Sequence, residues 1–374
     1  MKKITILALH LGYGGIEKFI TNLSNSLSND YEIEIISTYK IFDTPFFKLN
    51  EKVKVKYLIN NLKPNKKEIE KSLKKLKLIT LIKELYKSVK ILYLKKYKMI
   101  NYIKNCDSHV IISTRDIHNK WLGKYGNKNA IKIATEHNHH DNNKKYIKKI
   151  VDSTKGLNYF VVVSNELKKF YKSLVKCPVI CIPNSIERLP NKVSDLNNKT
   201  IISVGRLEKI KGFNDLIDIF DIVLKKYPDW NLNIVGDGSE FDALQDLINQ
   251  KKLNNSIKLL GYKNSKELDK LYQESSIYVM SSLNESFGIV LLEAMSYRIP
   301  CIAFDSANGA KEIISNNWDG YLIDNRDKNK MAKKIINLIN DENRRIIMGN
   351  NAYKKANKYL SQNIKQEWID LIEK

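Results

Sequence analysis

Short apolar, β-prone runs alternate with helical patterns along most of the chain, and this alternation limits the possible fold more than any other feature. The strand-like runs lie at 3–9, 32–37, 53–59, 109–113, 131–135 and 159–163, and then at 200–204, 231–235, 257–260, 277–280 and 301–304. Strands that alternate with helices form βαβ units with a mainly parallel sheet. Because 374 residues are too many for one small core, we predict two successive α/β domains that face a cleft.

A polar stretch separates the two alternations. Residues 183–199 contain two prolines and several asparagines, which is typical of a connection between domains. We therefore predict an N-terminal domain at 1–185, a linker at 186–199, a C-terminal domain at 200–355 and a last helix at 356–374. The C-terminal helices are expected to cross back to the N-terminal domain. The clearest helical patterns lie at 16–27, 213–226, 240–251, 266–273 and 287–297.

The cysteines and the N-terminus give no sign of export. Cys106, Cys177, Cys181 and Cys301 form no Cys-x-x-Cys pair and have no histidine at metal spacing. Buried, reduced thiols are the prediction. Residues 1–10 run directly into a glycine-rich loop without a cleavage pattern, so they indicate a buried strand and a cytoplasmic protein.

The positive charge is concentrated in the first half of the chain. Residues 1–190 hold 37 Lys and Arg against 16 Asp and Glu, whereas residues 191–374 hold 27 against 25. An excess of +21 in one half and +2 in the other indicates that the first half faces something anionic.

Residues 62–105 carry much of this charge, with 14 Lys against three acids. Apolar residues recur there at spacings of three or four, with tyrosines between them, so we predict a basic amphipathic helix or helix pair. It is either an ordinary solvated helix docked by its apolar face or an interfacial segment on anionic lipid, where each basic residue contributes about 1 kcal/mol. We expect no nucleic acid partner, because no recognised nucleic-acid motif is present.

Three loops follow strand-like runs and carry residues suited to an anionic ligand. The first, around Gly14 and Gly15, precedes a helix whose N-terminal amides can bind an anion, although a plain tight turn explains it equally well. The second carries Arg206 and Lys211, which can neutralise a diphosphate at the carboxyl end of a parallel strand.

The third loop leads into a helix that we expect to open at Phe287 and Gly288. Glu285 lies in the loop, and Glu293 lies about two turns into the helix, near the same face. Carboxylates accept hydrogen bonds from sugar and ribose hydroxyls. Taken singly, Glu293 is also compatible with a buried structural acid and Glu285 with an exposed loop acid.

In their joint order these motifs resemble the retaining glycosyltransferases of the GT-B fold, in particular glycosyltransferase family 4. The matching segments are Gly14-Gly15-x-Glu17, Glu136-His137-Asn138, Ile182-Pro183-Asn184, Val204-Gly205-Arg206 with Lys211-Gly212, Val235-Gly236-Asp237-Gly238, Leu260-Gly261, Glu285 to Glu293, and Gly320-Tyr321-Leu322-Ile323. The resemblance runs nearly end to end and implies two Rossmann-like domains.

The resemblance also implies a role for each matched residue. Gly15 would give a backbone N–H to the donor diphosphate, which Arg206 and Lys211 would stabilise as it leaves. Glu285 would bind the donor sugar, and Glu293 would bind the ribose. The implied catalytic residues are His137, Arg206, Lys211 and Glu285. The implied donor-binding residues are Gly14, Gly15, Gly205, Gly261, Tyr262, Phe287, Gly288, Ile289, Val290 and Glu293.

No metal or cofactor is expected. His137, His139 and His140 superficially resemble a metal cluster, but no carboxylate is spaced to complete a site, and only His137 is interpreted as functional. The chain contains no Asp-x-Asp, so protein cations are expected to replace a metal at the diphosphate.

The sequence thus predicts a retaining hexosyltransferase that works peripherally at the inner face of the cell membrane. It would move a sugar from a nucleoside diphosphate sugar, with UDP-sugars favoured, to a lipid-linked saccharide or surface glycopolymer. Two alternatives stay open: a soluble nucleotide-sugar epimerase of the same fold, and a non-catalytic basic protein that binds lipid or RNA.

Overall fold

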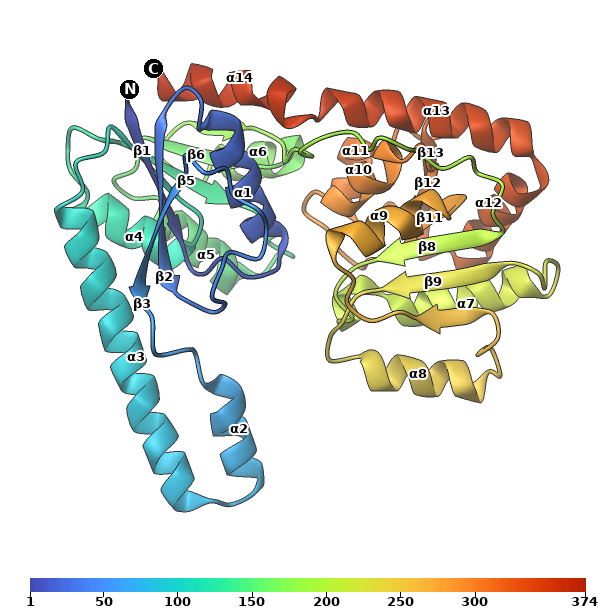
Figure 1. The fold of residues 1–374 in the computed structure, drawn as a ribbon, viewed down its shortest axis with the longest axis horizontal. Coiled ribbons are helices and arrows are strands. Elements are labelled where there is room, and N and C mark those ends of the chain that lie inside the picture. Colours follow the sequence, from blue (N-terminus) through green and yellow to red (C-terminus); the bar gives the residue numbers. More distant parts are fainter. The chain divides into compact units, whose positions relative to one another are not determined.

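A computed structural model describes residues 1–374 except Lys67, which belongs to the predicted 62–105 segment and lies outside the described residues. The chain forms two compact units. Unit 1 comprises Met1–Val163, Leu167–Ile182 and Lys365–Lys374, and unit 2 comprises Ser164–Glu166 and Pro183–Ile364. The predicted fold, with one α/β sheet in each half of the chain, is confirmed (Figure 1).

The sheet of unit 1 has seven parallel strands in the order β3-β2-β1-β4-β5-β6-β7. They are β1 (Lys3–Ala8), β2 (Glu32–Tyr39), β3 (Lys54–Ile59), β4 (Val110–Ser113), β5 (Ile131–Glu136), β6 (Tyr159–Val162) and β7 (Val179–Cys181). In β1, Ile4 pairs with Ile33 on one side and Val110 on the other. Isoleucines and valines fill these strands because a parallel sheet is covered on both faces.

The sheet of unit 2 has six parallel strands in the order β10-β9-β8-β11-β12-β13. They are β8 (Thr200–Val204), β9 (Asn231–Val235), β10 (Ile257–Leu259), β11 (Ile277–Met280), β12 (Cys301–Phe304) and β13 (Gly320–Ile323). Counted within the unit, this is the doubly wound order 3-2-1-4-5-6, in which the winding direction reverses between the first and fourth strands. Those two strands are β8 and β11.

Helices cover both sheets. In unit 1 they are α1 (Gly15–Leu27), α2 (Lys66–Lys74), α3 (Leu78–Lys104), α4 (Asp116–Tyr125), α5 (Lys144–Ser153) and most of α6 (Asn165–Tyr171). In unit 2 they are α7 (Phe213–Leu224), α8 (Phe241–Gln250), α9 (Ser265–Gln273), α10 (Ile289–Ser296), α11 (Asn308–Ile313), α12 (Lys328–Asn340) and α13 (Glu342–Lys358). The last helix, α14 (Ser361–Ile372), begins in unit 2, and its final residues belong to unit 1. None of the helices in the described part of the chain has both the length and the apolar content needed to span a membrane.

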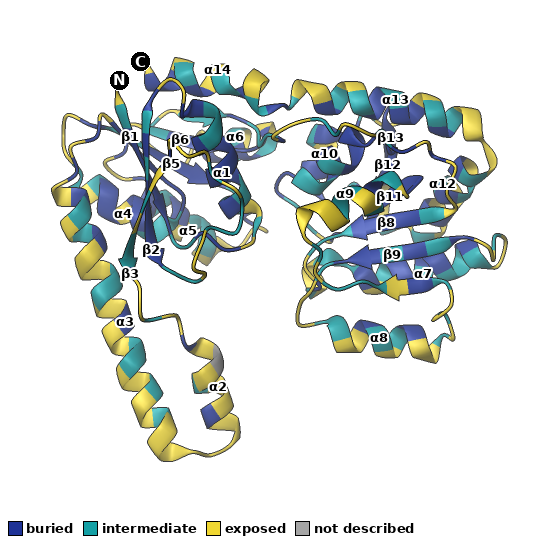
Figure 2. Ribbon diagram, in the orientation of Figure 1, coloured by how far each residue is buried: buried dark blue, intermediate teal, exposed yellow. Residues whose placement is uncertain are grey.

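The basic segment is a helix pair, as one form of the prediction had it. Figure 1 shows α2 and the first half of α3 extending beyond the sheet of unit 1, and Figure 2 shows that most of this hairpin is exposed. The second half of α3 returns to the sheet, where Ile91, Met99 and Ile103 are buried.

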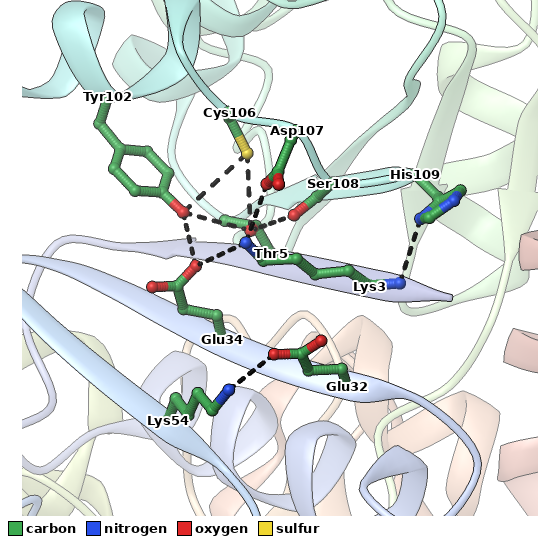
Figure 3. Close-up of polar contacts among 10 residues, drawn as sticks. All are labelled: Lys3, Thr5, Glu32, Glu34, Lys54, Tyr102, Cys106, Asp107, Ser108 and His109. Atoms are coloured by element: carbon green, nitrogen blue, oxygen red, sulfur yellow. Dashed lines mark hydrogen bonds and ion pairs between the residues drawn. The ribbon is translucent and has the colours of Figure 1, made fainter. Parts of the chain in front are cut away.

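A polar cluster fastens this second half of α3 to the sheet (Figure 3). Tyr102 donates a 2.8 Å hydrogen bond to Glu34 on β2, and its hydroxyl lies 3.4 Å from Thr5 Oγ1 on β1. Lys3 pairs with Asp107, just after α3, at 2.8 Å. Burial raises the pKa of Tyr102 strongly, so this hydroxyl stays protonated and remains a donor.

The structure corrects three local predictions. The helix expected to open at Phe287 begins at Ile289, because Gly288 has φ +86° and ends the preceding loop. The run Gly320–Ile323, which we did not predict as a strand, forms the edge strand β13. The four cysteines are free as predicted, but only Cys106 and Cys301 are buried.

Candidate functional site

The predicted residues of unit 2 gather where the strand order reverses. Arg206 and Lys211 follow β8, and Glu285 follows β11, which pairs with β8 through Ile277 and Ile201. In open α/β sheets, ligands bind outside the carboxyl ends of the strands at this switch point. The fold therefore brings residues from two distant parts of the chain to the position where a ligand is expected.

Lys211 and Glu285 contact each other directly. Lys211 Nζ lies 2.5 Å from Glu285 Oε2, and the two side chains are only 19% and 18% exposed. The attraction between two charges that are largely shielded from water is strengthened by the lower local dielectric. Loss of either partner would leave the other charge uncompensated. The pair places one cation and one carboxylate side by side at the carboxyl ends of these strands.

Backbone contacts hold the two loops of this pair together. Ser281 Oγ donates to the carbonyl oxygen of Lys211 at 2.9 Å, and the Leu283 N–H donates to the carbonyl oxygen of Ile210 at 2.8 Å. Gly212 has φ +62°, and a Cβ there would lie 2.3 Å from the Ser281 carbonyl oxygen. Only glycine fits this close approach without strain.

Arg326, which the sequence reasoning missed, supports the loop after β11. Its guanidinium donates to the carbonyl oxygens of Ser281 and Ser282 at 3.0 and 2.8 Å and pairs with Asp215 at 2.5 Å. It also lies over the ring of Phe304, 4.3 Å from the centroid. The sequence held one sign of this role, because Arg326 follows the apolar run Gly320–Ile323. We did not predict that run as a strand.

The segment between Glu285 and α10 is fixed by α11. The Gly309 N–H donates to the Glu285 carbonyl oxygen at 2.7 Å, and a Cβ on Gly309 would lie 2.4 Å from Phe287 Cα. Phe287 is buried, while Ile289 and Val290 are half-buried in the first turn of α10. The first amides of a helix lack intrahelical partners, so this turn suits an anionic or hydroxyl ligand.

Glu293 lies in α10 and Glu285 lies in the loop before it, as the sequence predicted. The Tyr272 hydroxyl lies 3.5 Å from Glu293 Oε2. Burial and the charge of Glu293 raise the pKa of Tyr272, which keeps its hydroxyl available as a donor. Glu293 is half-buried rather than enclosed in the apolar core.

The remaining predicted residues of unit 2 are more exposed. The Arg206 guanidinium pairs with Glu208 at 2.7 Å, and its side chain is 61% exposed. Gly205 donates to Val235, and Gly261 accepts from Gly236 in the neighbouring loop. Tyr262 is 52% exposed beside Gly261. These residues lie in the loops after β8 and β10, outside the Lys211–Glu285 pair.

The glycine loop of unit 1 lies against a buried carboxylate, Glu17, whose ion pair the sequence did not predict. Gly14 precedes α1, and Gly15 opens it with no atom within 4 Å of a Cβ placed there. The buried Glu17 binds Arg115 at 2.9 Å and lies 3.5 Å from His10 Nδ1. Because a Cβ on Gly14 would lie 2.3 Å from Glu17 Oε2, the loop and the carboxylate fit closely together.

His137 follows β5 in unit 1 and is held by two neighbours. Its Nε2 lies 2.9 Å from Thr135 Oγ1, and its ring centroid lies 4.3 Å from that of Phe19. The carboxylate of Glu136 accepts the backbone N–H groups of His137 and Asn138 at 2.8 and 2.7 Å, which fixes the loop.

The two following histidines are occupied by packing and by a carboxylate. His140 stacks on Phe170 with centroids 3.6 Å apart. His139 Nδ1 lies 2.9 Å from Asp141 Oδ1. The prediction that no carboxylate lies at metal spacing from these histidines is wrong, because ligand atoms of His139, His140 and Glu166 all lie within 4.8 Å of one another. The role of His137 and the expectation of no metal stay predictions.

A basic cavity of about 580 Å³ lies between α3, α4 and α5 of unit 1. Its charged lining consists of Lys95, Arg115, Asp116, Lys120, Lys149 and Asp152. Lys149 pairs with Asp116 at 2.9 Å. Burial lowers the pKa of Lys95, as does the nearby charge of Lys149. Cations outnumber acids in this cavity, so it favours an anionic group.

Known proteins resemble this chain both in sequence and in fold. Residues 184–355, nearly the whole of unit 2, match the family described as glycosyl transferases group 1. Unit 2 is therefore similar to the glycosyl transferases of group 1. The resemblance predicted from the motifs is thereby confirmed, and the switch-point residues belong to this domain.

Relatives extend the similarity to the whole chain. An uncharacterised glycosyltransferase of Haemophilus influenzae is 29% identical over the full length of both chains. The Campylobacter jejuni enzyme named GalNAc-alpha-(1->4)-GalNAc-alpha-(1->3)-diNAcBac-PP-undecaprenol alpha-1,4-N-acetyl-D-galactosaminyltransferase is 26% identical, over 100% of this chain and 98% of its own.

A solved structure agrees on the fold. A variant of S. aureus TarM in complex with Fondaparinux, alpha-GlcNAc-glycerol and UDP superposes with a TM-score of 0.80 over 100% of both chains, at 18% identity. The predicted GT-B fold is confirmed.

Proposed function

We propose that the protein is a retaining, metal-independent glycosyltransferase. It moves a hexosyl group from a UDP-sugar, or another nucleoside diphosphate sugar, to a lipid-linked saccharide or surface glycopolymer at the inner, cytoplasmic face of the cell membrane. The observation that carries this proposal is the Lys211–Glu285 pair at the switch point of the group 1 domain.

In this proposal different residues of unit 2 bind different parts of the donor sugar nucleotide. Lys211 and Arg206 neutralise the diphosphate, Glu285 accepts hydrogen bonds from the sugar hydroxyls, and Glu293 accepts those of the ribose. Gly261 and Tyr262 lie against the base, and the first turn of α10 gives backbone N–H groups. Preorganised donors and charges of this kind typically contribute roughly 3 kcal/mol each to catalysis.

The transfer breaks the bond between the anomeric carbon and the diphosphate oxygen and forms a bond from that carbon to an acceptor oxygen on the same face. Cleavage adds one negative charge to the departing diphosphate, which Lys211 stabilises, and a phosphate oxygen then takes the proton of the acceptor hydroxyl. His137 and Gly15 are assigned to the same reaction by the family resemblance. No side chain is assigned as a covalent nucleophile.

Two features support an anionic or lipid-linked acceptor. The Campylobacter relative is named for a PP-undecaprenol substrate, and unit 1 holds the basic cavity lined by Lys95, Lys120 and Lys149. We propose that this cavity binds a phosphate of the acceptor. UDP is favoured as the leaving group because the TarM structure contains UDP.

The test is incubation of the purified chain with a panel of nucleotide sugars, with and without a lipid-linked saccharide and with and without a chelator. Acceptor-dependent release of nucleotide that survives the chelator supports the proposal. Interconversion of free donors would support an epimerase instead, and binding without turnover would support a non-catalytic basic protein. An inverted product would contradict retention.

A further inference from the structure

The hairpin formed by α2 and α3 carries an exposed apolar surface at its free end. The hairpin tip, as we call it, consists of Leu73, Leu76, Leu78, Ile79, Ile82 and Leu85, which are 47–86% exposed. Scattered single apolar residues are normal on a protein surface, but a contiguous group of large aliphatic side chains marks a surface that binds something.

A polar contact joins the two helices of the hairpin. Asn65 donates to the Glu84 carbonyl oxygen and carboxylate at 2.8 and 2.6 Å. This contact fastens the start of α2 to α3, whereas the side chains of the hairpin tip remain exposed. Leu76, the most exposed at 86%, lies in the connecting turn with φ +51°.

The hairpin is anchored at the opposite end. Ile91 packs with Tyr39 and Ile59 in a small core cluster, and Met99 and Ile103 are fully buried. The cluster around Tyr102 fastens the last turn of α3 to β1 and β2 (Figure 3). One half of α3 therefore holds the hairpin on unit 1 while the other half presents its tip to the surroundings (Figure 2).

The charge around the tip identifies its partner. Lys74, Lys75 and Lys77 lie in and beside the turn, are exposed, and form no ion pair with any described residue. Aliphatic side chains next to free lysines match the boundary between acyl chains and anionic headgroups. A second copy of the hairpin would bring the same positive charges together, which disfavours self-association.

We propose that the hairpin tip inserts into the headgroup region of an anionic lipid bilayer, with Lys74, Lys75 and Lys77 on the headgroups. This deepens the membrane-facing part of the proposed function by naming the surface that docks. It assigns docking to the free end of the 62–105 segment, rather than to its whole length as the sequence suggested. The proposed insertion needs neither donor nor acceptor, so it is testable separately from transfer.

The test measures sedimentation of the full chain with vesicles of phosphatidylcholine alone or mixed equally with phosphatidylglycerol. Ile79→Gln with Ile82→Gln removes apolar surface, Lys74→Gln with Lys75→Gln removes charge, and Lys225→Gln with Lys226→Gln is a control at exposed sites in unit 2. We expect binding to mixed vesicles to fall at least fivefold in both tip variants and to be unchanged in the control.

A Leu76→Trp variant reports insertion directly, because its extra fluorescence should shift to shorter wavelength only when mixed vesicles are present. UDP binding by each variant, measured in parallel, monitors the donor site, so a failure of docking is separable from a failure of the proposed function. Equal binding to neutral and mixed vesicles, or unchanged binding in both tip variants, would overturn the proposal. So would a dimer of the free protein that the Ile79 and Ile82 substitutions dissociate.

Discussion

Lys211 Nζ and Glu285 Oε2 lie 2.5 Å apart although 74 positions separate the two residues in the chain. Each follows a different strand, and the two strands, β8 and β11, are neighbours at the switch point of one sheet. A ligand that enters this position meets a cation and a carboxylate that are already oriented. This preorganisation is the physical basis of the proposed donor site.

Replacing either member of this pair should abolish most activity. Lys211→Ala and Glu285→Ala should each lower kcat at least tenfold, because each removes a preorganised charge and leaves its partner unpaired. The decrease in kcat of the double variant should be smaller than the product of the decreases in the two single variants. Steady-state kinetics give these values, circular dichroism checks the fold, and Lys209→Ala in the adjacent turn is the control. Near-normal activity in both single variants would refute the site.

Two glycines with similar backbone angles should respond differently to alanine. Gly212 and Gly261 have φ +62° and +66°, but a Cβ meets the Ser281 carbonyl at Gly212 and no atom within 4 Å at Gly261. Gly261→Ala should cost about 1 kcal/mol of unfolding free energy from backbone strain alone, and Gly212→Ala about 2–3 kcal/mol. Urea unfolding measures both. Equal losses of unfolding free energy in the two variants would mean that the close approach of the loops at Gly212 does not add to the cost of the substitution.

Several elements of the fold were predictable from the sequence, and the reasons for the failures are physical. Short apolar runs such as 277–280 lie between turn residues and are typical of buried strands. The sequence therefore predicted these strands correctly. The start of α10 was misplaced because Gly288 has a left-handed conformation that apolar periodicity does not reveal. Strand β13 was missed because it begins with Gly320 and lies at the sheet edge.

The candidate site was predictable only in part. The residue types and their order along the chain indicated Lys211, Glu285 and Glu293, but not which of them touch. That Arg326 would support the loop after β11 depends on packing between segments 44 and 45 residues apart. No spacing rule in one sequence specifies such a contact, and the same holds for Glu17 and Arg115.

The stability of the protein should fall in weak acid because of His118. This side chain is fully buried, and burial lowers its pKa from 6.5 to about 3. Below pH 6.5 the unfolded chain takes up a proton that the folded chain does not, so the free energy of unfolding decreases as the pH falls. The slope is at most about 1.4 kcal/mol per pH unit. His118→Gln, which can still bond Thr38, should show a smaller slope in urea unfolding. An identical slope in His118→Gln and in the unsubstituted protein would show that His118 does not cause the loss of stability in acid.

The basic cavity of unit 1 should affect the acceptor and not the donor. Lys120→Ala and Lys149→Ala should each raise the acceptor KM roughly tenfold, as expected for loss of one charge-assisted hydrogen bond to a phosphate. The donor KM should stay unchanged, and so should both constants in Lys148→Ala, an exposed neighbour on α5. A matching rise of the donor KM would show that the cavity does not serve the acceptor alone.

The melting temperature of the protein in a panel of nucleoside diphosphate sugars tests the central claim most directly. Ligand that binds only the folded state raises the melting temperature by mass action. We predict that at least one UDP-sugar raises it in the natural chain and that Lys211→Ala loses most of the increase. No increase with any nucleotide sugar, or an equal increase in Lys211→Ala, would contradict a donor site built on Lys211 and Glu285.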